Sequence, residues 1–464
     1  MNQSTTATGR WREFLERGNF AITAVLTSGV GIYAMNEFIT ISLLPNVVAE
    51  IGGERRYEWV TTLYLVASVI PATSVGATLT RFGPRRAYSI ALLVFAAGSV
   101  LCALAPTMTV LLGARVLQGL GGGALAGLGY AMISAALPER LWSRAAALVS
   151  VMFGVGTLVS SAIGGFDAEF VSWRAGFGLL AVLALMLLVF VPIAMPTRLA
   201  GRAVAILRIP VRSLVLLGGA ALAISGADIP ENTTIVIVLL LLGVLLVLAF
   251  VAVDRGSQTS VLPRKTFGPG PLKWIYLTLG ILMAAMMVDT YVPLFAEELD
   301  GVSPLVAGFL GAALAIGTTV GQILSASIAR AETVMRVVAV APVVMASGLV
   351  LAAAGQRSFG PTALIATWTL GLVIAGAGAG LAWPHLSAWA MAAVVEPGQK
   401  AVAAAAVNTV QLTSAAFGAG LAGVLVDLHG TLDKAASTTT FLAFAALVAV
   451  GTVASCRAAR PAPV

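Results

Sequence analysis

Three charged residues lie inside apolar stretches that are long enough to cross a bilayer, namely Glu37, Arg115 and Asp289. A charged side chain at the middle of a membrane-spanning helix costs about 2.5–3.5 kcal/mol on insertion scales, and an arginine cannot lose its proton to avoid that cost. Each of the three is therefore expected to face a partner or a water-filled cavity. A carboxylate partly out of water and beside an arginine can be switched between its charged and neutral forms when the pair is made or broken. The three residues are thus candidates for proton coupling.

The positions of these residues in their helices predict that they share one depth. Glu37 and Asp289 each lie about seven residues before the outer end of a helix, and Arg115 lies about seven residues after the outer end of another. At about 1.5 Å per residue, all three would lie near 10 Å below the outer surface, where opposite charges can neutralise one another. Two alternatives remain open: static ion pairs that only secure packing, and an Arg115 side chain that extends to the outer interface.

A second set of residues could line a substrate cavity. His385 can relay protons near neutral pH, and Trp383 and Trp389 beside it can form the walls of an apolar pocket. Asn408 and Gln411, one helical turn apart, can bind a substrate by hydrogen bonds. The alternatives are an interfacial belt for the tryptophans, a structural role for the histidine, and contacts between helices for the two amides.

Other kinds of chemistry are not indicated. The chain has no phosphate-binding GxxxxGK[ST] motif, which argues against direct use of ATP. Its two histidines and two distant cysteines do not form a familiar metal site, so we expect no metal, no cofactor and no enzyme activity. The net charge of +7 is explained by membrane orientation, and no nucleic-acid partner is expected.

The helices that must position these residues are membrane-spanning. Of the 464 residues, 59% are hydrophobic and only 10% are charged, and apolar runs of about 20 residues recur along the chain. We predict an all-α integral membrane protein with fourteen spans. Their predicted bounds are 20–44, 58–79, 87–106, 108–135, 142–165, 174–195, 212–228, 233–253, 272–296, 303–328, 334–355, 361–388, 400–428 and 436–456.

The basic residues predict the orientation. With the N-terminus in the cytoplasm, 21 of the 27 lysines and arginines fall in cytoplasmic segments, five fall outside and Arg115 lies within the membrane. This bias places both termini in the cytoplasm. Only four of the 27 basic residues are lysines, which together with the high content of Ala, Gly and Val is typical of a bacterial protein, so the expected location is a bacterial inner membrane. The first 18 residues lack the pattern of a signal peptide, so the first apolar segment is expected to be retained as a helix.

Two polar cytoplasmic linkers divide the chain. The predicted parts are a cytoplasmic segment 1–19, a six-helix bundle 20–195, linkers with an inserted two-helix hairpin 196–273, a six-helix bundle 274–456 and a tail 457–464. Similar segments close the first helix of each bundle, PNVVAEIG at residues 45–52 and PLFAEELDG at residues 293–301. This similarity is expected if the two bundles share one ancestral unit.

Four local motifs lie in the first, fourth and fifth predicted spans and in the loop between the second and third. They are GATLTRFGPRR at residues 76–86, RVLQG at residues 115–119, GTLVSSAIGG at residues 156–165 and NEFITISLLP at residues 36–45. In these motifs the chain resembles the major facilitator superfamily, and within it the fourteen-span drug:proton antiporters. The resemblance covers residues 20–456. It departs from the family pattern at Thr80, where the family has Asp, and at Ser160 and Ser161, which replace Gly-Pro.

The resemblance implies specific roles for the motif residues. It assigns conformational gating to Gly76, Arg81, Gly83, Arg85, Arg86, Gly164 and Gly165. The glycines of the loop motif permit a tight cytoplasmic turn, and its arginines can bind carboxylates or helix ends of the other bundle. The resemblance assigns proton coupling or substrate orientation to Arg115. It places Gln118 and Asn36 in the substrate cavity, with Asn36 where the family carries a carboxylate and Glu37 next to it.

The function implied by the resemblance is proton-coupled transport by alternating access. The expected partners are protons, membrane lipids and a small hydrophobic or amphipathic substrate that is exported, and the expected state is a monomer. A lipid or metabolite transporter is an alternative within the same class. A membrane scaffold or sensor without transport activity is the alternative from another class.

Overall fold

The computed structural model describes most of the chain. The described residues are 17–136, 171–197, 210–227, 232–257, 260–326, 330–356, 361–393, 397–429 and 432–459, together with Val155, Gly156, Val159, Ser160, Ile163, Phe166 and Ile328. All regular structure within these residues is helical, as the sequence predicts.

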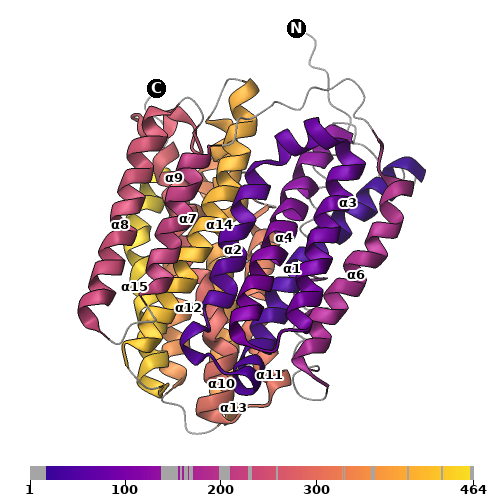
Figure 1. The fold of residues 1–464 in the computed structure, drawn as a ribbon. Helices are drawn as coiled ribbons and strands as arrows, with labels where there is room; N and C mark the ends of the chain where they lie inside the picture. Colours follow the sequence, from indigo (N-terminus) through magenta and orange to yellow (C-terminus); the bar gives the residue numbers. More distant parts are fainter. Residues whose placement is uncertain are drawn as a thin grey trace.

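Long helices form the body of the molecule (Figure 1). Their bounds are α1 Arg17–Ile51, α2 Trp59–Thr73, α3 Val75–Ala103, α4 Met108–Ala136, α6 Trp173–Ala194, α7 Val211–Gly226, α8 Thr233–Gly256, α9 Leu272–Met286, α10 Val292–Asp300, α11 Pro304–Ala326, α12 Ala331–Gly355, α13 Pro361–Ala392, α14 Pro397–Asp427 and α15 Lys434–Ala458. Short 3-10 helices lie at Glu54–Arg56 (η2), Arg264–Phe267 (η4) and Met287–Tyr291 (η5).

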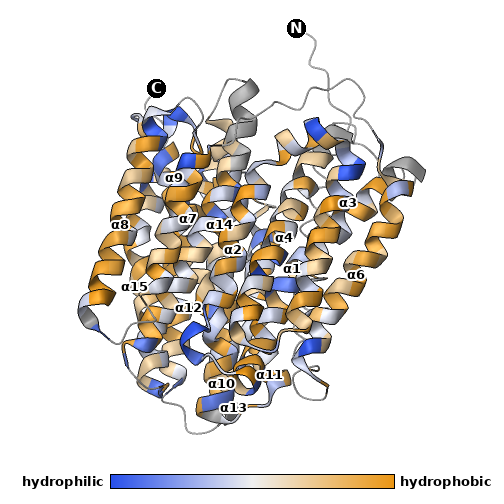
Figure 2. Cartoon of the chain, viewed as in Figure 1, coloured by the Kyte–Doolittle hydropathy of each residue, from blue (hydrophilic) through white to orange (hydrophobic). Residues whose placement is uncertain are grey.

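Eleven helices in the described part of the chain are long and apolar enough to cross a membrane. The α7 helix, at 16 residues, is shorter. The predicted span 142–165 lies mostly outside the described residues, and fourteen spans therefore remain a prediction. Hydrophobic residues predominate along the long helices, and many of the hydrophilic residues lie toward the two ends of the bundle, as expected for a protein surrounded by lipid (Figure 2).

One predicted boundary is wrong. The first helix does not end at residue 44, because α1 continues through Pro45 to Ile51. Val47 beyond the proline is 1% exposed, and its packing offsets the lost backbone hydrogen bond. The predicted span 272–296 corresponds to one apolar stretch, Leu272–Leu299, in which η5 interrupts the α-helical hydrogen bonding. Pro293 has no N–H to donate to the Asp289 carbonyl, which instead accepts from Val292, and this i+3 bond tightens the segment into a 3-10 helix.

The predicted glycine turn between the second and third spans is confirmed. Gly83 has φ 74° and ψ 166°, a conformation that favours glycine. A Cβ added at this position would lie only 2.7 Å from the backbone oxygen of Thr197. Pro84 begins the next helical segment, where its missing N–H costs nothing. The connection therefore needs only one non-helical residue.

The helices pack as two sets with a hairpin between them. One set contains α1, α2, α3, α4 and α6, and the other contains α9 and α11 to α15. The α7 helix packs against α8, and also against α2 of the first set and α14 of the second. We call these the N-terminal helices, the C-terminal helices and the hairpin. The inner end is the end where α1 begins and α15 ends, and the outer end is opposite (Figure 1).

A buried carboxylate fastens the following linker to the hairpin. Asp254, near the end of α8, accepts hydrogen bonds from the Ser213 hydroxyl at 2.8 Å and from the backbone N–H groups of Val261 at 2.7 Å and Leu262 at 2.9 Å. These bonds satisfy a charge that would otherwise be costly to bury. The linker is thereby held against the inner ends of α7 and α8.

Candidate functional site

Arg115 is enclosed by neutral groups of the N-terminal helices. Its side chain is 1% exposed. Nε donates to the backbone carbonyl of Val60 at 2.9 Å, and Nη1 donates to Asn36 Oδ1 at 3.1 Å and to Gln118 Oε1. The Tyr64 ring lies 4.3 Å from Cζ, in position for a cation–π interaction. The side chain therefore does not extend to the outer interface, and that alternative is wrong.

Asn36 and Gln118 hold this arginine. Both are fully buried, and the Gln118 amide also donates to the Ser99 hydroxyl at 2.8 Å. The resulting chain of polar contacts runs from α1 through α4 to α3. The sequence placed both amides in a substrate cavity, whereas the structure turns them toward Arg115, because a buried guanidinium needs acceptors for its donors.

The two predicted acids lie on contacting segments, Glu37 on α1 and Asp289 on η5. Glu37 is half-buried, and it follows directly after Asn36, which binds Arg115. Asp289 is 3% exposed, and its Oδ1 has no hydrogen-bond partner among the described residues. The gathering of all three charges stays a prediction. The predicted ion pair is not observed within the described part of the chain, where Arg115 bonds to neutral acceptors.

The outer end carries a group of contacts that the sequence did not predict. The Tyr57 hydroxyl donates to the Thr290 carbonyl at 3.1 Å, and the Tyr291 hydroxyl donates to Glu58 Oε2 at 3.2 Å. The rings of the two tyrosines lie 4.8 Å apart. Glu58 is fully buried and packs against Gly423 of α14, where an added Cβ would come within 2.6 Å of its Cγ.

The hairpin joins the same group of contacts. The Trp59 indole donates to the Ser225 carbonyl at 3.1 Å, and the hydroxyls of Thr62 and Ser225 lie 3.0 Å apart. We call Tyr57, Glu58, Trp59, Thr62, Ser225, Thr290, Tyr291 and Gly423 the outer closure. It binds the start of α2 to η5, α14 and α7.

The loop motif at residues 76–86 contacts the end of α6. Arg85 donates from Nη2 to the Pro192 carbonyl at 2.6 Å and from Nε to the Met195 carbonyl at 3.1 Å, which places a positive charge at a helix C-terminus. This helix belongs to the N-terminal set, whereas the sequence predicted a contact with the other set. Arg81 and Arg86 are exposed, and Thr80 bonds to its own helix through the Gly76 carbonyl at 2.8 Å.

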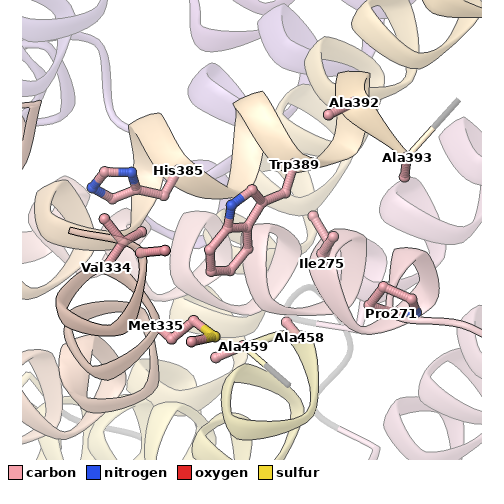
Figure 3. Close-up of a pocket in the computed structure, with 11 residues that line it drawn as sticks. Pro271, Ile275, Val334, Met335, His385, Trp389, Ala392, Ala393, Ala458 and Ala459 are labelled. Carbon is pink, nitrogen blue, oxygen red and sulfur yellow. The ribbon is translucent and has the colours of Figure 1, made fainter. Parts of the chain in front are cut away.

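His385 and Trp389 line one pocket near the inner end (Figure 3). The pocket has a volume of about 510 Å³ and lies between the starts of α9 and α12 and the ends of α13 and α15. Trp383 does not line it and packs instead against the apolar core. Two of the three predicted aromatic residues are therefore together.

The remaining predicted residues are partly placed. Asn408 and Gln411 are half-buried on α14, three residues apart and thus on one face of the helix. Ser160 is fully buried. Ser161, Gly164 and Gly165 lie outside the described residues. Among the residues that are described, no cluster of three or more His, Cys, Asp or Glu side chains could hold a metal ion.

Comparison with known proteins identifies relatives over the whole length. The profile of the Major Facilitator Superfamily matches residues 26–419. A Mycobacterium tuberculosis protein described as a probable multidrug-efflux transporter is 49% identical over 463 residues, covering 99% of this chain and 98% of that protein. Multidrug resistance protein 3 of Bacillus subtilis is 24% identical over 310 residues, covering 64% of this chain and 59% of that protein.

Solved structures share the fold at low identity. A D-xylose-proton symporter has a TM-score of 0.64 at 16% identity, covering 93% of this chain and 97% of its own. A POT family transporter in complex with 5-aminolevulinic acid has a TM-score of 0.65 at 14% identity, covering 93% and 94%. With helices that cross a membrane, a profile match over most of its length and a close relative over nearly all of it, the chain belongs to the Major Facilitator Superfamily of membrane transporters.

Proposed function

We propose that this chain exports hydrophobic or amphipathic small molecules in exchange for protons, as a member of the drug:proton antiporters. The observation that carries the proposal is the presence of an acid on each side of the contact between α1 and η5, namely Glu37 next to the Asn36 that binds Arg115, and the buried Asp289. The description of the 49% identical relative as a multidrug-efflux transporter supports the substrate class.

The acids lie where a movement between the two sets of helices would change their surroundings. Glu37 is on α1 and Asp289 is on η5, so such a movement changes the distance between their charges and the access of water to both. Charge separation and solvation are two of the factors that set the proton affinity of a carboxyl group. Arg115 is held by α1, α2 and α4, so its charge stays with Glu37 throughout.

The hydrogen bonds at the outer end are consistent with transport by alternating access, in which one end of the protein is shut while the other is open. The outer closure ties α2 to η5 and α14, and it corresponds to a state in which the outer end is shut. Opening that end requires loss of the two tyrosine hydrogen bonds. The five-residue segment η5 carries both Asp289 and Tyr291. Protonation of Asp289 and loss of the hydrogen bond from Tyr291 to Glu58 would therefore affect the same short segment.

We propose the predicted fourteen-span topology, with both termini in the cytoplasm of a bacterial inner membrane and a monomer as the working unit. The division into bundles 20–195 and 274–456 with an inserted hairpin agrees with the packing of α7 between α2 and α14. Asn408 and Gln411 are proposed to contact the substrate. The roles proposed for Asn36 and Gln118 change to positioning of Arg115.

A transport measurement in proteoliposomes tests this function. The purified chain is reconstituted, a pH gradient is imposed, and movement of the amphipathic dye ethidium is followed by fluorescence. Transport should follow the gradient and stop when nigericin collapses it. Ethidium movement that is unchanged without a gradient, or no movement in either case, would contradict proton-coupled export.

A further inference from the structure

The pocket beside His385 is separate from the central charges. Its walls come from α9, α12, α13 and α15, and neither Glu37, Arg115 nor Asp289 lines it. It lies wholly among the C-terminal helices near the inner end. A volume of about 510 Å³ is within the range of small-molecule sites, which are mostly apolar with a few placed polar groups.

Hydrogen bonding fixes the tautomer of His385. The Ser325 hydroxyl has one proton, and it donates that proton to the Leu381 carbonyl at 2.6 Å. The same oxygen lies 2.8 Å from His385 Nε2, so the ring must donate from Nε2 to Ser325. In a neutral imidazole the other nitrogen, Nδ1, is then an acceptor. No hydrogen bond reaches Nδ1 from any described residue, so this acceptor is available to a ligand.

The other walls select a flat apolar molecule. Figure 3 shows the Trp389 indole projecting from α13 toward Met335, with His385 and Ile275 on either side. Trp389 is half-buried and lines the pocket, and an indole ring can stack with an aromatic ring of a ligand. Small side chains line the pocket at the ends of α13 and α15, namely Ala392, Ala393, Ala458 and Ala459, and they leave room for a ring.

The charges next to the pocket disfavour a cation. Lys273 and Arg457 lie on the same two helix ends as the lining residues Pro271 and Ala458, and both cations contact the Trp274 ring, at 5.6 and 4.5 Å from its centroid. Like charges repel, so a cation is disfavoured here. The lining residues themselves carry no Lys or Arg side chain that could pair with an anion, so the walls fit a neutral molecule.

We propose that this pocket is a second small-molecule site, which binds a neutral, flat, hydrophobic molecule that donates one N–H or O–H hydrogen bond to His385. Its use as a capture site for exported molecules rests on the proposed function. Binding itself does not, because it requires neither a gradient nor transport.

Equilibrium binding of a matched pair of fluorescent probes tests the site. The first probe is N-phenyl-1-naphthylamine, which is neutral and has one N–H, and the second is its N-methyl derivative, which has none. Fluorescence is measured with the full chain in nanodiscs, and the signal of empty nanodiscs is subtracted. Wild-type protein should bind the N–H probe about threefold to tenfold more tightly than the N-methyl probe, as one net hydrogen bond implies.

Two variants localise the binding. Ala392→Phe fills the pocket and should remove saturable binding of both probes, whereas Ala366→Phe, an exposed position near the other end of the same helix, should leave it unchanged. His385→Gln places its amide nitrogen near Nε2, where it can still donate to Ser325, and removes the Nδ1 acceptor. It should weaken only the N–H probe, to the affinity of the N-methyl probe.

Other outcomes overturn the proposal. Unchanged binding to Ala392→Phe would place the probes elsewhere, and equal weakening of both probes by His385→Gln would remove the acceptor role of Nδ1. If both variants behave as expected while ethidium transport does not depend on the pH gradient, the binding site is supported and the proposed proton antiport is contradicted.

Discussion

The outer end and the centre of the molecule join the same two sets of helices in different ways. At the outer end, hydroxyl and carboxylate groups of α2 and η5 are bonded directly, through Tyr57 to Thr290 and through Tyr291 to Glu58. At the centre, Glu37 and Asp289 lie on the contacting segments α1 and η5, and Asp289 Oδ1 has no bonding partner within the described residues. Direct bonds hold one conformation, whereas carboxyl groups can gain or lose a proton. The difference suggests that the closure sets the resting state and the acids decide when it changes.

The largest effect is expected from Arg115→Ala. The substitution leaves the acceptors of Asn36, Gln118 and Val60 buried without their donor, which should lower the free energy of unfolding by about 3 kcal/mol. Ethidium transport per folded molecule should also fall to background. Thermal unfolding and transport are measured beside Arg336→Ala, an exposed position, as control. Wild-type stability and transport in Arg115→Ala would show that the centre does not depend on this cation.

Gly423→Ala should keep the outer end from closing. The added methyl group would lie 2.6 Å from Glu58 Cγ, and Glu58 is fully buried with little room to move. We expect transport to fall about tenfold, since the shut state becomes strained. Gly113→Ala, which meets nothing within 4 Å, is the matched control. Equal transport by the two variants would contradict the close contact of α14 with α2.

A smaller effect is expected from Tyr57→Phe and Tyr291→Phe. Each removes one hydrogen bond of the closure, worth about 1 kcal/mol, so each should raise the population with an open outer end about fivefold. Double electron-electron resonance between labels at Glu54 and Ser303 reports this population. Tyr88→Phe, whose hydroxyl bonds to Val25 within the N-terminal helices, should cause no shift. A similar shift in all three variants would contradict a specific role of the Tyr57 and Tyr291 hydrogen bonds in holding the outer end shut.

Thr80→Asp should have the smallest effect. It restores the family carboxylate beside Arg81 at an exposed place, where an ion pair is worth at most about 1 kcal/mol. The population with a shut inner end should grow by no more than about fivefold, measured as a distance between labels at Arg86 and Arg336. A decrease of that population would contradict the expected stabilisation.

The sequence predicted those features that depend on local pattern. Hydrophobic runs placed most helices within a few residues, and the glycines of the motif at residues 76–86 predicted the tight turn that the structure contains at Gly83. The common depth of the three membrane charges was derived from the helical rise per residue and stays a prediction.

The sequence could not predict which groups meet across long separations. Tyr57 and Thr290 are 233 residues apart. Glu58 is the first residue of a predicted span, and a charged residue at the end of a span is common and does not indicate a buried contact. The break at η5 depends on Pro293, which was interpreted as part of a closing segment. Arg115 was expected to pair with an acid, but neutral amides from its own set of helices provide closer acceptors.

The central claim is that Glu37 carries the coupled proton, and Glu37→Gln tests it most directly. Glutamine keeps the size and hydrogen-bonding capacity of the side chain but fixes it in a neutral form. Two ethidium fluxes are measured in proteoliposomes of the variant and the wild type: exchange at equal pH, and accumulation driven by a pH gradient. We predict that the variant retains exchange and loses gradient-driven accumulation. Gradient-driven accumulation at the wild-type rate would contradict the claim and leave Asp289 as the candidate proton carrier.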